Sequence, residues 1–588
     1  MNFHKESIIS FIVIIIQPRR NILSEQDNIS KDISLDAGAS SSLSRETLDK
    51  ILSLSGSEAL NRLLDFENAG QIVRDISRVD LFWLIKKIGE DDSLPLLRLA
   101  SNDQWQYVMD MELWQRDRLG LKETFQWLDR FHKADPVRLA QWLYSDDGNL
   151  LAHFFLNNIL DVKIKEEQDY VPPDGYFTFD NLYYISILDK ENEEAIEQIL
   201  HQLASQDYNR FQALLLGLGG VIPAEAEEEM YRMKGIRIAE DGYLPFEEAI
   251  SIYSYQRPDL LSQGDSGYKL FYPDEETSAL VPLTPLSYTQ GDNIFTRSIA
   301  KIPDSASLER LRLEFAGLCN QIFSADAVMP EDIEDLVKVT RKAAGYLNIG
   351  LEKLSGGDLK KSEEFIRNNP LVSIFRVGFG MTLELKWKAE KQTKASWFLR
   401  HGLDAGFWGD EWGGMLKGIL MKRPLFYRIE YRSFEDISEV EGAGDIISRL
   451  LLLDKLMEHV SDFFNLNMDM FKDPLLTFHT LLFHSWAIRK LNLGNNFAPL
   501  SIEQTKEFFT LIRGNEASPP FTLKIYKDVF LGDHMSLIQG IEPDDKALLE
   551  DTLKGLWEEF AEEYATVDIK ALDPRFTKYI IVGAGENG

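Results

Sequence analysis

A five-residue motif that occurs twice places the strongest constraint on the fold of this chain. Leu99–Asp103 reads LASND, and Leu203–Asp207 reads LASQD. Each copy follows an amphipathic run and is followed by an aromatic residue, Trp105 or Tyr208. Small polar residues between two apolar-periodic stretches are typical of a junction between helices. A helix–cap–helix unit used twice predicts a stacked helical scaffold.

The serine of each motif is expected to cap the helix that follows it. Ser101 is followed three positions later by Gln104, which is a capping-box pattern, and the apolar residues after it recur on one helix face. In the second copy, Tyr208 stands where Glu or Gln would close the box. We therefore expect Ser205 to cap its helix without the reciprocal contact.

The likeness extends beyond the motif. Trp114–Gly120 (WQRDRLG) is echoed by the shorter Tyr231–Gly235 (YRMKG). Two diverged copies of a helical module are therefore predicted, near residues 81–144 and 185–255. The alternative is that helix caps reuse Ser and Asp for local reasons, without any repeat.

With 588 residues, the chain is too long for a single hydrophobic core. The predicted fold class is all-α, with a repeat-like helical superhelix followed by a second helical domain. A Ser-rich start and a stretch with frequent Pro and Gly mark the predicted boundaries. The predicted parts are a flexible lead-in (1–43), a helical repeat-like domain (44–256), a Pro- and Gly-rich linker (257–304) and a C-terminal helical domain (305–588).

One segment carries a conflicting signal. From Phe375 to Lys388 the odd positions are apolar and the even positions are polar or Gly, which is the period of a strand. A strand of this length is unusual, and no matching partner strand lies nearby. We therefore predict a helix here, with a strand as the alternative.

The charge of the chain limits its partners. It carries 95 acidic and 63 basic side chains, a formal net charge of −32. Such a surface repels a phosphate backbone, so nucleic acid is not expected as a partner. The basic run 386–400, which contains two tryptophans, is better explained as an intramolecular counterpart of the acidic surface. The expected partner is a protein, and the oligomeric state is left open.

Cysteine usage and hydropathy indicate a cytoplasmic protein without a membrane span. Cys319 is the only cysteine, which excludes an intramolecular disulfide and a Cys-based zinc cluster. The apolar run Ile8–Ile16 has nine residues, about half of the ~20 that a membrane-spanning helix needs. A peripheral segment and a degenerate signal are alternatives to the favoured interpretation, which is translated sequence upstream of the true start.

The stretch 401–414 (HGLDAGFWGDEWGG) most resembles a functional site. Its glycines permit close approach of a ligand, and its carboxylates are able to bind a metal or move a proton. The spacing matches no metal or hydrolase motif, and a turn between helices, anchored by tryptophans, explains the same composition. The candidate residues are His401, Asp404, Trp408, Asp410, Glu411 and Trp412.

Two histidines deserve a separate interpretation. His479 and His484 lie five positions apart, which separates them by about 140° around a helix. Zinc-binding helices place histidines four apart on one face. We therefore expect core or boundary histidines and assign no catalytic, cofactor or metal residue. No cofactor is expected.

Several strings resemble an uncharacterised bacterial family that carries the label of a domain of unknown function. These strings are Ala343–Glu352 and Ser355–Asp358, Phe375–Phe379, Leu113–Arg118 and Asp573–Phe576. The resemblance covers most of the chain after Ser44 and implies a mostly helical bacterial cytoplasmic protein, with no catalytic residues to transfer. Residues 81–113 are also similar to helical repeats in the cytosolic amino-terminal domain of magnesium transporters, but transport is not implied.

The predicted architecture favours a non-enzymatic scaffold or adaptor that presents a helical groove to a protein partner. The alternative is an enzyme or small-molecule sensor with a site between the two halves, near 401–411. A shallow apolar groove on the stacked helices would favour the first interpretation. A large, closed polar pocket near 401–411 would favour the second.

Overall fold

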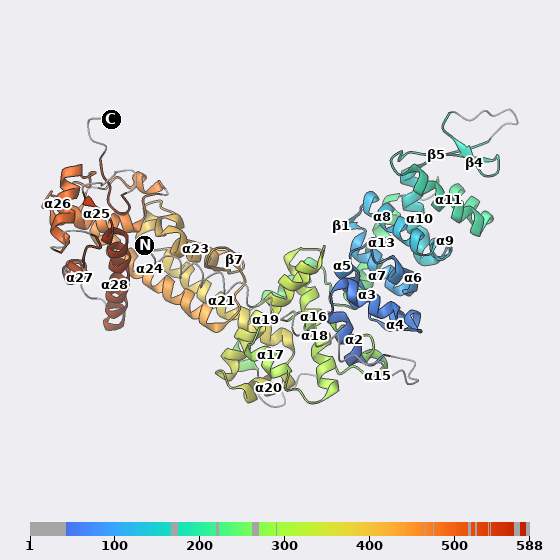
Figure 1. The fold of residues 1–588 in the computed structure, drawn as a ribbon, viewed down its shortest axis with the longest axis horizontal. Helices are drawn as coiled ribbons and strands as arrows, with labels where there is room; N and C mark the ends of the chain where they lie inside the picture. The colour runs from blue at the N-terminus through green and yellow to red at the C-terminus, as the bar shows by residue number, and fades with distance from the viewer. Residues whose placement is uncertain are drawn as a thin grey trace. The chain divides into compact units, whose positions relative to one another are not determined.

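The computed structural model describes residues 43–165, 174–218, 223–261, 270–289, 291–464, 466–473, 475–514, 519–523, 526–538, 540, 542–569 and 577–583. These residues are predominantly helical, which confirms the predicted fold class (Figure 1). None of the described helices combines the length and the apolar character that a bilayer crossing requires. The predicted lead-in, 1–43, lies outside the described residues apart from Leu43.

The chain divides into two compact units. Unit 1 comprises Met1–Ser254, Leu261–Ala344 and Leu359–Ser373, as far as these ranges are described. Unit 2 comprises Tyr255–Leu260, Gly345–Asp358 and Ile374–Gly588, with the same restriction. The boundaries expected from the sequence, at 256 and 304, stay a prediction.

Short helices follow one another in chain order through the first part of unit 1 (Figure 1). Most of them contact a neighbour one or two places along the chain, as α3 does with α5 and α4 does with α6, whereas α13 contacts α10 and α7. The helices are α2 (Arg45–Ser53), α3 (Gly56–Leu64), α4 (Ala69–Asp75), α5 (Arg78–Ile88), α6 (Leu94–Leu99), α7 (Asn102–Glu112), α8 (Leu121–Ala134), α9 (Pro136–Leu143), α10 (Asp146–Ile159), α11 (Glu193–Gln206), α12 (Tyr208–Gly217) and α13 (Pro223–Ala239). The internal repeat itself stays a prediction.

The first motif forms the predicted cap. Ser101 Oγ accepts a hydrogen bond from the Gln104 backbone N–H at 3.2 Å, and Gln104 Oε1 accepts from the Ser101 N–H at 2.7 Å. This capping box starts α7 directly after α6. The Gln104 amide also donates to two backbone carbonyls at the end of α4, so the cap joins neighbouring helices.

The expectation for the second motif is wrong. Ser205 lies inside α11, and its hydroxyl donates to the Gln202 carbonyl at 3.0 Å. Asp207 caps α12 instead and accepts from the Arg210 N–H at 3.1 Å. The helix continues through Gln206, a good helix former, and the carboxylate two positions after Ser205 is a strong acceptor for the free N–H groups.

The structural counterpart of Asp207 is Asp135. Asp135 has φ −156° and ψ 89°, and Asp207 has φ −156° and ψ 98°. Each follows a helix of 14 residues, α8 or α11, and each caps the next helix. The hydroxyl of Tyr144 donates to the Leu203 carbonyl at 2.8 Å and so links the two helix pairs. By this shared cap geometry, the helix pair α8–α9 corresponds to the helix pair α11–α12.

The second predicted correspondence is also wrong. Trp114–Leu119 forms a hairpin of β1 (Trp114–Gln115) and β2 (Arg118–Leu119), whereas Tyr231–Gly235 lies within α13. The two stretches are neighbours in space, because the rings of Trp114 and Tyr231 are 5.4 Å apart. Their similar sequences therefore do not mark equivalent copies.

A small antiparallel sheet interrupts the helices of unit 1. Its strands are β3 (Leu160–Ile164), β4 (Phe177–Thr178) and β5 (Tyr183–Ile187), in the order β3-β5-β4. Leu160 pairs with Ile187 and Ile164 pairs with Tyr183, which fixes the register of β3 on β5. The sheet lies against α10 and α11.

The remainder of unit 1 packs around the long helix α18. A buried carboxylate connects these elements to the short helices at the start of unit 1. Asp80 of α5 accepts from the backbone N–H groups of Leu283 and Thr284 at the start of α16. The described part of the predicted linker carries short packed helices. The elements are α14 (Phe246–Ala249), η1 (Ile250–Tyr253), α15 (Glu275–Ser278), α16 (Thr284–Ser287), α17 (Ile294–Ile299), α18 (Ser305–Asp326) and α20 (Leu359–Asn368).

Unit 2 is built from long helices around an aromatic core. Phe483 stacks between Phe530 and Phe560, and Trp486 packs edge-on against Trp557. The elements wholly in unit 2 are η2 (Pro258–Leu260), α22 (Trp397–Arg400), η3 (Ala405–Trp408), α23 (Gly409–Leu420), β6 (Phe426–Tyr427), β7 (Tyr431–Arg432), α24 (Ile437–Phe463), η4 (Met468–Lys472), α25 (Phe478–Lys490), α26 (Ile502–Ile512), α27 (Lys527–Met535) and α28 (Pro543–Ala565).

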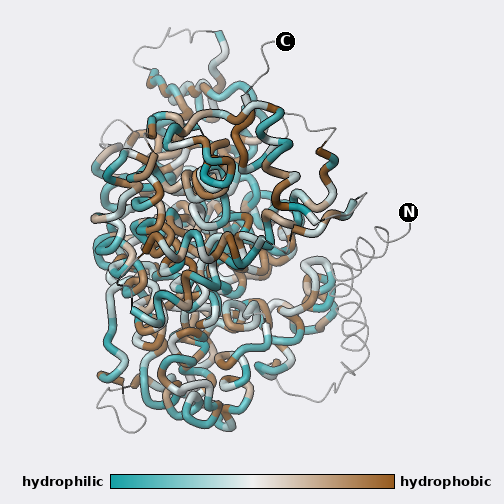
Figure 2. Tube along the Cα trace, turned by 90° about the vertical axis from the view of Figure 1, so that its left-hand side faces the viewer, coloured by the Kyte–Doolittle hydropathy of each residue, from teal (hydrophilic) through white to brown (hydrophobic). Residues whose placement is uncertain are grey.

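Two further helices, α19 (Ile333–Ser355) and α21 (Leu371–Thr393), end in unit 2. Helix α21 contains residues 375–388, the segment with the strand-like sequence pattern. The predicted helix is confirmed. Phe375 and Phe379, one helical turn apart, both pack edge-on against Tyr346 of α19. Apolar and polar segments alternate along the trace in Figure 2, as expected for helices with one buried face.

Candidate functional site

The structure places the predicted site residues on a surface turn of unit 2. Asp404 caps η3 by accepting from the Gly406 N–H at 2.8 Å. The ring of His401 bonds the Trp397 carbonyl through Nδ1 at 2.9 Å, and Asp410 and Glu411 lie in the first turn of α23. All four side chains are exposed, and no group of acidic, His or Cys side chains among the described residues is arranged to hold a metal.

Several glycines of this stretch occupy positions where a side chain would be strained or would clash. Gly402 and Gly409 have φ of 73° and 75°, a region that disfavours a side chain. A Cβ on Gly413 would lie 2.1 Å from the Ala405 carbonyl oxygen, and one on Gly414 would lie 2.3 Å from the Tyr427 ring. The glycines therefore allow α23 to pack closely on η3 and on the β6–β7 hairpin.

The two tryptophans have different surroundings. Trp408 is buried against Phe398 and Phe407. Trp412 is half-buried, stacks on Phe478 with 5.5 Å between ring centres, and borders an open hollow of about 370 Å³. The charged groups of that hollow are largely paired with one another, as in Arg449–Asp551 and Lys527–Glu558.

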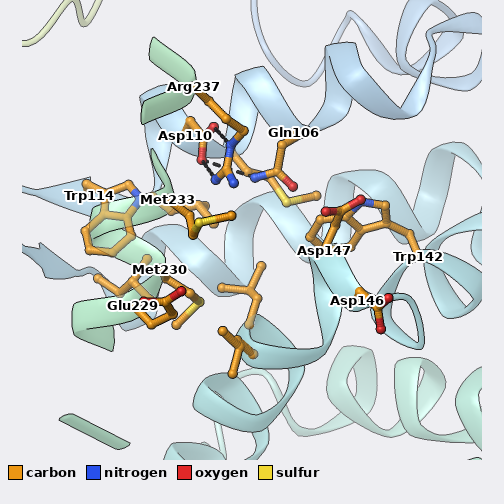
Figure 3. Close-up of a pocket in the computed structure, with 15 residues that line it drawn as sticks. Gln106, Asp110, Trp114, Trp142, Asp146, Asp147, Glu229, Met230, Met233 and Arg237 are labelled. Carbon is orange, nitrogen blue, oxygen red and sulfur yellow. Dashed lines mark hydrogen bonds and ion pairs between the residues drawn. The ribbon is translucent and has the colours of Figure 1, made fainter. Parts of the chain in front are cut away.

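A second cavity, of about 200 Å³, lies within unit 1 between α7, the β1–β2 hairpin, α10 and α13 (Figure 3). We call it the α7–α13 groove. Its walls combine tryptophan, methionine and leucine side chains with several carboxylates. In Figure 3, Trp114, Met230 and Met233 lie on one side, and Trp142 and Asp147 lie on the other.

A buried ion pair forms one wall of the groove. The side chain of Asp110, in α7, is only 4% exposed, and both of its carboxylate oxygens accept from the Arg237 guanidinium at 2.6 Å (Figure 3). Gln106 Nε2 donates to the same carboxylate at 3.1 Å. Gln106 Oε1 is buried and accepts no hydrogen bond within the described part of the chain.

Helix α13 has an unusual distribution of side chains. Lys234 is buried at 4% exposure, whereas Tyr231, Met233 and Ile236 are 44%, 41% and 54% exposed. The Lys234 ammonium lies 5.1 Å from the centre of the Trp114 ring, and burial lowers the pKa of Lys234 to about 8. The face of the Trp114 ring and the charge of Asp110 favour the ammonium and partly offset the cost of burying it.

The open rim of the groove is acidic. Asp146 and Asp147 occupy the first turn of α10, after the cap at Ser145, and both are exposed. Glu229 of α13 pairs with Arg232 at 2.7 Å. Neither aspartate makes an ion pair or a side-chain hydrogen bond with the residues that the structure describes.

Sequence reasoning missed this groove. The predicted repeat assigns Trp114 and Tyr231 to equivalent copies, although their rings contact each other and Trp114 lines the groove. A usable signal was present in α13, where Met230, Tyr231, Met233 and Ile236 fall on several sides of one helix. Apolar residues on all sides indicate a helix that is buried or that contacts a partner.

Three comparisons with known proteins place these observations in context. Residues 39–583 match a family described as "Family of unknown function (DUF6178)". No curated protein and no solved structure matches the chain. The local similarity of residues 81–113 to magnesium transporters is therefore unsupported.

Proposed function

Because this chain belongs to the DUF6178 family, which has no established function to transfer, we propose its function from the groove. The protein is a non-enzymatic helical scaffold or adaptor that binds a protein partner through unit 1. The α7–α13 groove is the docking site. The proposal rests on residues of unit 1 alone.

The observation that carries this proposal is that α13 buries a lysine, Lys234, and exposes large apolar side chains. A helix in water normally buries its apolar side chains and exposes its lysines. In α13, the exposed Met233 lines the cavity together with Met230 and Trp114. Tyr231, which contacts the Trp114 ring, and Ile236 are exposed on the same helix. Covering each large apolar side chain contributes about 1.5–3 kcal/mol when burial is complete.

The composition of the groove also suits a polypeptide partner. Methionine side chains adapt to partners of different shape, and tryptophans at an interface supply large contact areas. A cavity of about 200 Å³ admits one large apolar side chain, since a cavity of about 150 Å³ holds a benzene molecule. The exposed part of α13 provides a surface around that anchor.

Affinity purification from the native host tests the proposal. The wild-type chain is expected to retain a stoichiometric protein, and Met233→Glu and Ile236→Glu are expected to lose it, because a carboxylate opposes burial. Ile429→Glu is the matched control, since Ile429 is 88% exposed and belongs to unit 2.

Each variant is first compared with the wild type by circular dichroism and thermal unfolding. If every retained protein also remains bound to both groove variants, the groove is not the docking site. Loss of the same protein from the Ile429→Glu control would show non-specific capture.

The alternative function, an enzyme or small-molecule sensor with a site near 401–411, stays a prediction. The described geometry of that stretch is accounted for by a cap at Asp404, by close packing at Gly413 and Gly414 and by the buried Trp408. No observation within unit 2 favours it over the groove.

A further inference from the structure

We propose that two copies of this chain associate through strand β3, the long edge strand of the small sheet in unit 1. The two β3 strands pair antiparallel, and the two-fold axis passes beside Val162. The sheets of the two copies then form one continuous sheet in the order β4-β5-β3-β3-β5-β4. The inference is independent of the proposed function, because no residue of this sheet lines the α7–α13 groove.

The outer edge of β3 carries backbone groups that point away from its partner strand. On the inner edge, the Lys165 N–H donates to the Leu182 carbonyl at 2.9 Å. Hydrogen-bonded and non-bonded pairs alternate along an antiparallel ladder, so the N–H and C=O groups of Val162 and Ile164 face outward. The described residues supply no hydrogen-bond partner for these groups. An edge of this kind is a template for pairing with another strand.

A second β3 strand satisfies these groups reciprocally. Val162 of each copy donates to and accepts from Val162 of the other. The Ile164 N–H of each copy donates to the Leu160 carbonyl of the other. The Leu160 N–H takes no part, because it already donates to the Leu156 carbonyl at the end of α10.

The same pairing covers an apolar side chain that one copy leaves exposed. Leu160 of β3 and Ile185 of β5 lie on the buried face of the sheet, at 7% and 0% exposure. Ile164 lies on the same face but is 45% exposed. In the proposed pairing, Leu160 of the second copy lies directly opposite Ile164 and extends the apolar face over it.

The order of charges along β3 selects this register. The strand reads LDVKI, so an acidic and a basic residue flank Val162 symmetrically. Antiparallel pairing about Val162 places Asp161 of each copy opposite Lys163 of the other. Pairing centred on Asp161 or on Lys163 instead places like charges opposite each other, which is unfavourable. A shift by one residue turns the apolar side chains to the wrong face.

The aromatic ring of Tyr176 holds both charged side chains beside this edge. Its hydroxyl donates to the Asp161 carboxylate, and the Lys163 ammonium lies 4.6 Å from the ring centre. The paired strands have only five residues each, which makes a small interface. We therefore expect a reversible dimer with a dissociation constant on the order of 10 µM.

Sedimentation velocity of the full chain at physiological salt, over concentrations on both sides of that value, tests the inference. The wild type is expected to change from monomer to dimer as the concentration rises. Val162→Pro removes the outward N–H and spares the ladder with β5, to which Val162 contributes no hydrogen bond. It is expected to weaken the dimer at least about tenfold.

Charge exchange gives a sharper test. Asp161→Lys and Lys163→Asp each place like charges opposite each other and are each expected to weaken the dimer by about tenfold. An equimolar mixture of the two variants is expected to restore it, because each strand then meets opposite charges. Restoration also shows that both variants are folded. Asp65→Lys is the matched control: it changes the net charge as Asp161→Lys does, at an exposed position outside the sheet, and is expected to leave the dimer unchanged.

Any of four results would overturn the inference. These are a wild type that stays monomeric at every concentration, a dimer that Val162→Pro does not weaken, a mixture that does not restore the dimer, and equal weakening by Asp65→Lys and Asp161→Lys. The proposed function is tested separately. Met233→Glu is expected to lose the native protein partner and keep the dimer, and Val162→Pro is expected to do the reverse.

Discussion

Ser101 and Asp207 each satisfy a backbone N–H at the start of a helix, whereas Ser205 does not. We therefore expect Ser101→Ala and Asp207→Ala each to lower the free energy of unfolding of unit 1 by about 1 kcal/mol. Ser205→Ala is expected to change it by less than about 0.5 kcal/mol, because Ser205 is an exposed residue inside α11. Urea unfolding of the three variants measures the difference, and a large effect of Ser205→Ala would contradict the assignment of the cap.

Asp80 shows what a single buried carboxylate contributes. It is 1% exposed and accepts from Ser77 Oγ and from two backbone N–H groups at the start of α16. In Asp80→Asn, an amide NH₂ replaces one acceptor and meets those donors. We expect a loss of about 3 kcal/mol in the free energy of unfolding of unit 1. Asp65→Asn, at an exposed position, is the control in the same urea experiment, and equal effects would contradict this role of Asp80.

At the scale of the elements, α19 and α21 meet through backbone at glycine. A Cβ on Gly378 would lie 1.9 Å from the Tyr346 carbonyl oxygen, and one on Gly350 would lie 2.2 Å from the Ile374 carbonyl oxygen. Backbone atoms cannot move aside as a side chain does, so the helices must separate. Both glycines lie in the sequence strings that resemble the family. The close approach of the two helices explains why glycine is needed at these two positions.

Gly378→Ala is therefore expected to destabilise unit 2 by about 3 kcal/mol. Gly442→Ala is the matched control, because Gly442 lies in α24 with open space around its Cβ position. Alanine there is expected to stabilise the helix by about 0.5–1 kcal/mol, owing to its higher helix propensity. Thermal unfolding of both variants measures whether each substitution lowers or raises the stability of the protein. A neutral Gly378→Ala would show that the helices do not meet this closely.

Secondary structure was largely predictable at this scale, and side-chain orientation was not. Residues 375–388 were predicted as a helix because a strand without a partner is unfavourable, and α21 confirms this. The hairpin at Trp114–Leu119 was not predicted, since two-residue strands leave almost no periodic signal. The orientation of α13 was equally hidden, because its apolar residues define no single buried face.

At the scale of the whole molecule, two buried histidines make stability depend on pH. Nε2 of His484 donates to the Ala498 carbonyl, and Nδ1 accepts from the Ile581 N–H. A proton added at Nδ1 would face the Ile581 N–H, which is itself a donor. Burial lowers the pKa of His484 and of His534 to about 4. Both imidazoles are therefore neutral in the folded chain, while in the unfolded chain they bind protons below about pH 6.5.

A lowered folded-state pKa gives stability that is fully present above the unfolded value and is lost as the pH falls. Between about pH 6.5 and pH 4 we expect each buried histidine to remove about 3 kcal/mol of stability. His534→Phe removes one titrating group, so the slope of the unfolding free energy against pH between 6 and 5 should fall by about 1 kcal/mol per unit.

Urea unfolding at a series of pH values measures this slope. His459→Gln is the control, because His459 is exposed and its side chain is in water in both states. A wild-type slope that His534→Phe does not reduce would contradict a neutral, buried imidazole at this position.

The sequence by itself determined the local features of this protein: its helical class, the capping box at Ser101 and a family resemblance that residues 39–583 bear out. These follow from interactions within a few positions of the chain. Only the tertiary structure decided that Asp135 is the counterpart of Asp207, and that α13 turns Lys234 inward and Met233 outward beside Trp114. Such choices depend on contacts between distant segments, whose packing outweighs the preference of any single helix.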